Sequence, residues 1–234
     1  IGGLVGFANF APAITGNRVK NTKVFCDRSN NYKNYTSDDK FDINEIVGEY
    51  SGGTLDPSNT AENVEIRIIK PAGSQDELAN IIADNAKDIK LGSGEYTLYN
   101  VNASKTKNTV LSIEGNGAEN TFFRAGKETA DKPGEGNADF SYENSDVAFK
   151  NLTVKITNAN YMGFVRTKSL YFENCTISGR GSYWGVGKVV FKNCKFTQNG
   201  SDYNMWIYSG TDFLFENCTF NSSGKFINAY KEQS

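Results

Sequence analysis

One short pattern recurs four times in the C-terminal half of the chain, as Phe149-Lys150-Asn151-Leu152-Thr153-Val154, Phe172-Glu173-Asn174-Cys175-Thr176-Ile177, Phe191-Lys192-Asn193-Cys194-Lys195-Phe196 and Phe215-Glu216-Asn217-Cys218-Thr219-Phe220. The asparagines are 23, 19 and 24 residues apart. A repeat of this length is too short to bury its own apolar face, so successive copies must stack on one another. The pattern therefore predicts a solenoid.

Within each copy, apolar and polar residues alternate before the asparagine. Val147 and Phe149 would face inward, while Ala148 and Lys150 would face outward, which is the period of a strand with one buried face. The alternation slips by one at the asparagine, so we expect a sharp bend there, because asparagine tolerates the left-handed conformation. The four asparagines are predicted to bond from copy to copy as an internal ladder: Asn151, Asn174, Asn193 and Asn217.

The predicted fold is all-β, a right-handed parallel β-helix over residues 71–234. Its first rungs are expected in Lys90–Leu98 and Leu111–Gly117. A short amphipathic helix near residues 74–87, with Ser74 and Glu77 as a capping box, would cover the open end of the stack. The alternative, an antiparallel sandwich, would need Asn-Gly or Asp-Gly hairpin turns between the copies, and these are missing.

Equivalent positions in the repeat should form columns in the folded chain. Four phenylalanines are predicted to stack inside: Phe149, Phe172, Phe191 and Phe215. Cys175, Cys194 and Cys218 should also stack inside, as free thiols, because parallel neighbours point their Cβ atoms the same way; Cys26 has no predicted partner. On the outside, Lys150, Glu173, Lys192 and Glu216 should form a column of alternating charge.

Composition excludes several classes of function. The chain of 234 residues has no histidine and a net charge of −2, which excludes Ser-His-Asp and Cys-His catalysis and gives no sign of nucleic-acid binding. The cysteines lack CxxC spacing, so neither a zinc site nor any other cofactor is predicted. The polar loop 131–139 could hold calcium, but it does not match an EF-hand, and we favour a solvated loop. No apolar run is long enough to span a membrane, and the start at Ile1 suggests a fragment or a processed product.

Two stretches resemble known families. Asp88–Tyr96 followed by Ile113–Gly117 resembles the opening of pectate-lyase-like β-helix domains, and the Phe-x-Asn-Cys-Thr-Phe rungs resemble such domains of bacterial surface proteins. Ile1–Asn9 resembles the GLUG motif of bacterial surface and adhesin-like proteins, and Ile46–Leu55 is a second, poorer copy. The resemblance implies that residues 1–70 form a GLUG-like β-solenoid segment and that the protein is extracellular or on a bacterial cell surface. It implies no chemistry.

The aromatic residues of the second strands are the strongest candidates for a binding site. Trp206 and Tyr208 should face outward, near Tyr183 and Trp184 of the preceding rung, where they could stack on sugars. Asn204 and Asp202 could bind sugar hydroxyls. Alternatively, these rings pack against a neighbouring loop or domain.

The sequence thus favours a secreted, non-catalytic, adhesin-like module that contacts carbohydrate or a host or cell-surface ligand. The alternatives are a polysaccharide lyase or glycoside hydrolase on the same fold, and a structural spacer. Because the carboxylates are dispersed and histidine is absent, no turnover of pectin-like substrates is expected.

Overall fold

The structure is a computed structural model that describes residues 5–8, 15–27, 47–50, 57–83, 86–98, 110–125, 140–141, 144–156, 163–198, 203–208 and 210–230. The chain divides into two compact units, Ile1–Lys70 and Pro71–Ser234. Each unit is described by itself below.

The second unit is built from three parallel sheets and one helix, α1 (Gln75–Ala83). Sheet 1 contains, in spatial order, β5 (Asp88–Leu91), β7 (Val110–Glu114), β10 (Asp146–Lys150), β13 (Ser169–Glu173), β16 (Lys188–Lys192) and β19 (Asp212–Glu216). Sheet 2 contains β6 (Gly94–Leu98), β8 (Thr121–Ala125), β11 (Thr153–Ile156), β14 (Thr176–Gly179), β17 (Lys195–Gln198) and β20 (Thr219–Ser222). Sheet 3 contains β9 (Phe140–Ser141), β12 (Gly163–Val165), β15 (Gly181–Trp184), β18 (Met205–Tyr208) and β21 (Ile227–Tyr230).

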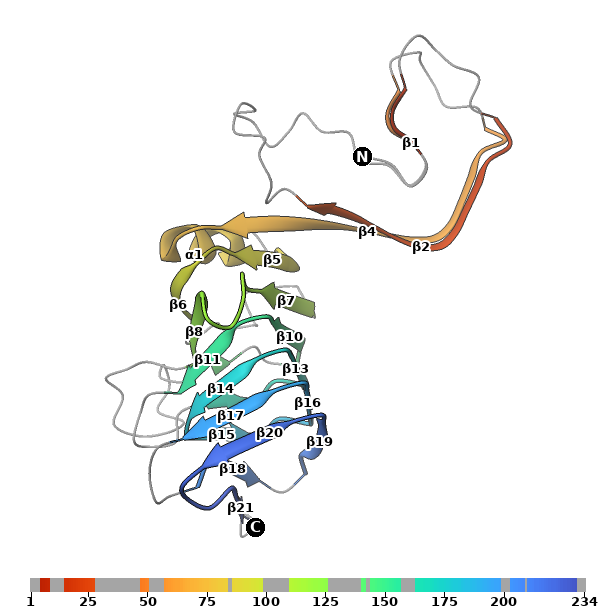
Figure 1. The fold of residues 1–234 in the computed structure, drawn as a ribbon. Coiled ribbons are helices and arrows are strands. Elements are labelled where there is room, and N and C mark those ends of the chain that lie inside the picture. Colours follow the sequence, from red (N-terminus) through yellow and green to blue (C-terminus); the bar gives the residue numbers. More distant parts are fainter. Residues whose placement is uncertain are drawn as a thin grey trace. The chain divides into compact units, whose positions relative to one another are not determined.

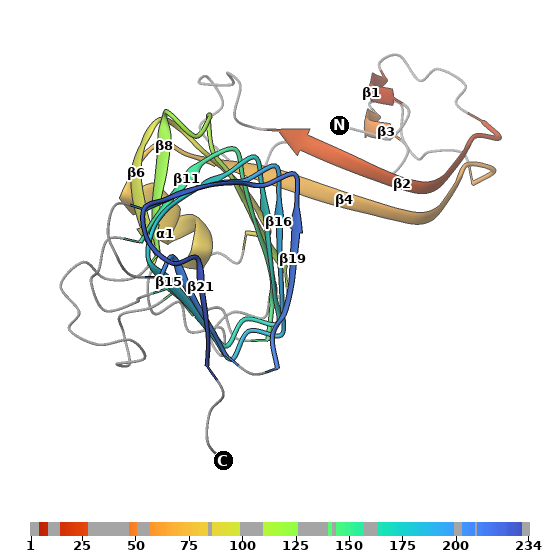
Figure 2. The same ribbon diagram turned by 60° about the horizontal axis from the view of Figure 1, so that its bottom comes forward.

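From β7 onward, each rung supplies one strand to each sheet, and successive rungs overlie one another in parallel register (Figures 1 and 2). The first rung supplies β5 to sheet 1 and β6 to sheet 2. In sheet 1, Phe149 pairs with Phe172, Phe172 with Phe191, and Phe191 with Phe215. The fold is thus an all-β parallel solenoid, as the repeat predicts, and every copy of the pattern occupies the equivalent place in its rung.

The corner between sheets 1 and 2 is made by the repeated asparagine and the residue after it. Asn151, Asn174, Asn193 and Asn217 all have the left-handed conformation, with φ between 51° and 54°. Each amide nitrogen from Asn174 onward donates to the amide oxygen of the preceding rung's asparagine, at 3.2, 3.3 and 3.4 Å.

The predicted ladder therefore forms, but its predicted internal position is wrong. Asn174, Asn193 and Asn217 are exposed and Asn151 is half-buried. The residue that turns the corner points its side chain outward, and the residue after it, Cys175 in the second copy, points inward. The left-handed turn thus explains the slip in alternation without burying the amide.

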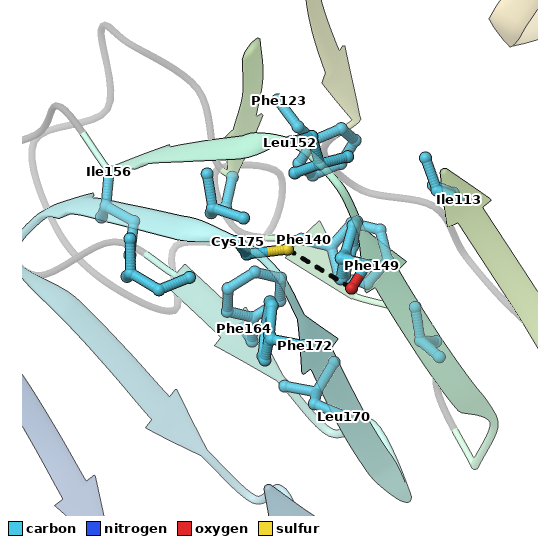
Figure 3. Close-up of a cluster of buried hydrophobic side chains, with 14 of the residues drawn as sticks. Ile113, Phe123, Phe140, Phe149, Leu152, Ile156, Phe164, Leu170, Phe172 and Cys175 are labelled. Carbon is cyan, nitrogen blue, oxygen red and sulfur yellow. Dashed lines mark hydrogen bonds between the residues drawn. The ribbon is translucent and has the colours of Figure 1, made fainter. Parts of the chain in front are cut away.

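The phenylalanine column fills the centre of the stack. Adjacent rings of Phe149, Phe172, Phe191 and Phe215 are stacked, with centroid distances of 5.3, 4.9 and 5.3 Å. The first three are fully buried, and Phe215 in the last described rung is partly buried. Figure 3 shows Phe164 of sheet 3 packed against this column at Phe149 and Phe172. The core assignment made from the sequence is confirmed.

The three cysteines after the asparagines lie inside as free thiols, with Leu152 in the equivalent place of the rung before. Cys175 and Cys194 are buried and Cys218 is partly buried. The Cys175 thiol donates to the Phe149 carbonyl at 3.4 Å (Figure 3). The pKa of Cys175 is raised and that of Cys194 is lowered, mainly by the interaction between the two neighbouring thiols. Burial raises the pKa of Cys218.

Helix α1 packs on the first rungs of the stack. Its Leu78 and Ile82 belong to the core, and the Ser74 hydroxyl accepts from the Glu77 amide at 3.2 Å, as the capping box predicts. The Gln75 side chain donates to the Thr97 carbonyl and accepts from the Thr97 amide, at 2.9 and 2.8 Å. Thr97 lies in β6, the first strand of sheet 2, so the helix saturates backbone groups at that edge.

The outward column next to the asparagine corner has alternating charge. Glu173 lies between Lys150 and Lys192, with Oε–Nζ distances of 3.7 and 3.8 Å, and Glu216 is in register with Lys192. The alternation extends further than the four predicted residues, because Lys150 is in register with Glu114 and Glu114 with Lys90. The predicted register is therefore confirmed on one wall of the stack.

The first unit repeats itself with a period of 42 residues. β1 (Val5–Ala8) pairs in parallel with β3 (Val47–Tyr50), and β2 (Arg18–Asp27) with β4 (Thr60–Ala72). Asn21 and Asn63 both have left-handed φ, and the Asn63 amide donates to that of Asn21 at 2.7 Å across 42 residues. The two predicted copies thus pair side by side as parallel strands.

Candidate functional site

The outer face of sheet 3 is set by the alternation in β18. Met205 is buried and Ile207 packs against the core, so Trp206 and Tyr208 project from the opposite face. Trp206 is in register with Ser182 on one side and with Asn228 on the other. Trp206 and Tyr208 are both partly exposed.

These two side chains belong to a cluster of four aromatic rings, called the aromatic face here: Tyr203, Trp206, Tyr208 and Tyr230. The Tyr230 ring lies 6.2 Å from that of Trp206 and 5.8 Å from that of Tyr208, and the Tyr203 ring lies 6.4 Å from that of Trp206. Tyr230 is 48% exposed. The rings therefore support one another while one of them presents a large area to solvent.

Cations lie next to this face. The Arg166 guanidinium lies 5.2 Å from the centroid of the Trp184 ring, and the Lys225 ammonium lies 5.1 Å from that of Tyr203, both within cation–π range. Trp184 follows Tyr183, which pairs with Ile207, so Trp184 lies beside the position of Tyr208 in the next strand. Trp184, which the sequence analysis places near Trp206, thus lies on the outer face of sheet 3.

Two predicted ligand-binding residues are corrected by the structure. Tyr183 is 1% exposed and its ring stacks on Phe164 at 5.6 Å, so it is a core residue whose pKa is raised by burial. Of the adjacent aromatic pair in β15, only Trp184 can face outward, because neighbouring side chains in a strand point to opposite faces. Asn204 is 4% exposed, so its amide is buried and not presented to a ligand. Asp202 lies outside the described residues.

Other residues of the face were missed by sequence reasoning. Tyr203 and Tyr230 lie outside the Phe-x-Asn repeat, and the structure gives the register of β21 with β18, which pairs Tyr230 with Tyr208. Asn228 pairs with Trp206 and offers an amide beside the indole. Arg166 occupies a left-handed turn, with φ of 53°, which nothing in its sequence neighbourhood indicates.

Glu95 and Asp146, two acidic residues on the outer walls, form ion pairs with cations. Glu95 contacts Arg124 and Lys155, and Asp146 contacts Ser169 and Lys168. The hydrogen bond from Arg124 lowers the pKa of Glu95, and the hydrogen bond from Ser169 lowers the pKa of Asp146. A carboxylic acid that protonates a leaving group needs the opposite shift, toward a higher pKa. These carboxylates therefore suit structural ion pairs better than glycoside or lyase chemistry.

The described residues give no metal-binding group of three or more histidine, cysteine or acidic side chains. The loop 131–139, considered for calcium, lies outside them. None of the helical segments that the structure describes has the length and apolar character needed to cross a membrane.

Comparisons with known proteins give no further guide. No family model, no curated protein and no solved structure matches this chain. The fold and the side chains on its walls therefore carry the functional argument.

Proposed function

We propose that this chain is a non-catalytic module of an extracellular or cell-surface protein that contacts carbohydrate through the aromatic face of sheet 3. The observation that carries the proposal is the grouping of Trp206, Tyr208, Tyr230 and Tyr203 on one outer wall. Rings of this kind stack on the apolar faces of sugars, and Asn228 beside Trp206 supplies a donor and an acceptor for hydroxyl groups.

The location outside the cell is part of the proposal. It is supported by the resemblance of Ile1–Asn9 and of the Phe-x-Asn-Cys rungs to segments of bacterial surface proteins. The adhesin-like role rests on the same resemblance. The non-catalytic part of the proposal rests on Glu95 and Asp146, whose carboxylates are held in ion pairs.

A panel of immobilised neutral and acidic polysaccharides tests binding directly, followed by titration calorimetry with the best binder. Trp206→Ala and Tyr230→Ala each remove one stacking surface of roughly 1 kcal/mol, so binding should weaken about five- to tenfold. Tyr171→Ala is the matched control, because Tyr171 lies on the outer face of sheet 1; it should bind as the unmodified chain does.

The proposal fails if no polysaccharide on the panel binds, or if Tyr171→Ala weakens binding as much as Trp206→Ala. Release of unsaturated sugars from pectin-like polymers, seen as new ultraviolet absorbance, would show that the module is an enzyme.

A further inference from the structure

A column of three free thiols runs through the stack and reaches the last described rung. Cys175, Cys194 and Cys218 occupy equivalent positions, as the flanking register shows: Lys195 pairs with Thr219 immediately after Cys194 and Cys218. Cys175 and Cys194 are each 2% exposed, whereas Cys218 is partly exposed. The column is therefore buried at one end and open to solvent at the other.

The thiols have the same orientation in successive rungs. Each Sγ lies within hydrogen-bond distance of two carbonyls, the one two residues earlier in its own rung and that of the inward phenylalanine one rung back. These Sγ–O distances are 3.4 and 3.5 Å for Cys194 and 3.4 and 3.4 Å for Cys218. Because the same contacts fix both sulfurs, the Sγ atoms repeat with the spacing of parallel strands, about 4.8 Å.

This spacing matches one kind of metal coordination. A zinc–thiolate bond is about 2.3 Å long, and two opposite bonds of about this length to one ion span about 4.6 Å. The ion would lie on the line between the sulfurs, parallel to the stack axis, with each Cβ–Sγ bond roughly perpendicular to that line. A disulfide suits the column less well, because its sulfurs must approach to about 2.05 Å while the parallel Cβ vectors keep them apart.

We infer that Cys194 and Cys218 form a two-coordinate site for a soft cation of the Cu(I) class. Thiolates select such ions, and coordination by only two ligands agrees with the lack of larger metal-binding groups among the described residues. Cys218 provides the entry, because it is the partly exposed member of the column. The site is independent of the proposed carbohydrate contact, which uses another sheet.

Binding exchanges protons for the ion. Two thiols lose their protons to solvent, two sulfur–copper bonds form, and one Cu(I) bound by two thiolates carries a net charge of −1; no oxidant or reductant takes part. Two protons are therefore released for each ion bound, and the affinity rises with pH.

The experiment titrates the full chain with Cu(I) alone, under anaerobic conditions, against a competing chelator. The unmodified chain should bind one ion and release two protons. Cys218→Ser and Cys194→Ser should each abolish this binding, whereas Cys175→Ser and Cys26→Ser should retain it. Far-ultraviolet circular dichroism checks that each variant folds, and the partly exposed Cys218 keeps the test decisive if the Cys194 variant does not.

Several results would overturn the assignment. These are a folded chain that does not bind Cu(I), undiminished binding by Cys218→Ser, and loss of binding in Cys175→Ser, which would place the ion deeper in the column. A Cys194–Cys218 disulfide detected by mass spectrometry after mild air oxidation, with no Cu(I) binding by the reduced chain, would also overturn it.

Discussion

The first and last described rungs of the second unit have different neighbours, although both contribute strands to sheets 1 and 2. At the first rungs, α1 places Leu78 in the core and Gln75 on the edge of β6. In the last described rung, Phe220 is 45% exposed and Phe215 is partly exposed. Phe215 has the same place in the repeat as the fully buried Phe191. Burial in a solenoid therefore comes from the neighbours on both sides, and not from the rung's own sequence.

The comparison is tested most directly by replacing phenylalanines that occupy equivalent positions in a middle rung and in the last described rung. Phe191→Ala should lower the free energy of unfolding by about 3–5 kcal/mol, because it leaves a cavity between two rungs. Phe215→Ala, in the partly exposed rung, should cost only about 1–2 kcal/mol. Equilibrium urea unfolding measures both, and equal losses would show that the last rung is as well packed as the middle.

One substitution removes the hydrogen bonds between α1 and the edge of sheet 2. Gln75→Ala removes both hydrogen bonds to Thr97 and should lower the free energy of unfolding by about 1–3 kcal/mol. It also exposes the edge of β6, so self-association should increase with concentration. Asn80→Ala, at an exposed position of the same helix, is the control. Analytical ultracentrifugation that finds both variants equally monomeric would contradict a role for Gln75 in edge protection.

The asparagine corners offer a smaller contrast. Asn174 bonds to the asparagine on either side, whereas Asn217 in the last described rung donates to Asn193. Asn174→Ala should cost about 1–2 kcal/mol, mostly from a left-handed conformation that alanine tolerates poorly, and Asn217→Ala slightly less. Glycine at either position should restore most of the loss in thermal unfolding. If glycine is as damaging as alanine, the ladder bonds and not the backbone conformation dominate.

The smallest effect is expected in the charge column. Glu173→Gln removes attraction to both Lys150 and Lys192 and should cost only about 0.2–1 kcal/mol, because these side chains are partly exposed. Glu216→Gln should cost less, since Glu216 is in register with one described lysine. Urea unfolding at low and high salt measures the difference, which salt should reduce. A loss that is unchanged at high salt would exclude a Coulombic origin.

Sequence reasoning succeeded where the repeat was strict. The spacing of Phe149, Phe172 and Phe191 fixed the register of sheet 1, and the charge column and the thiol column followed from it. It failed where a side chain's direction depends on local backbone geometry. A left-handed corner turns the asparagine amide outward, and a residue pattern alone cannot give that direction.

The candidate site was predicted less completely than the fold. It lies on the second strands, which have no shared pattern, so their register came only from the structure. Tyr183 and Trp184 are adjacent, and composition could not tell which one faces the core. Asn204, immediately before β18, is polar but buried, a placement that sequence hydropathy contradicts.

The two kinds of corner in each rung have different consequences for how this chain can change. In the four copies of the repeat, two residues separate the sheet 1 strand from the sheet 2 strand, as in β13 to β14. The connection from sheet 2 to sheet 3 instead varies from one residue between β14 and β15 to fourteen between β8 and β9. Lengthening a loop costs free energy only slowly, about 0.6 kcal/mol per doubling. Insertions can therefore accumulate at the variable corner, beside the aromatic face, while the rungs stay in register. The short connection between sheets 1 and 2 preserves the stacking of the repeat. The connection of variable length between sheets 2 and 3 is where evolution or protein engineering can introduce a new binding specificity.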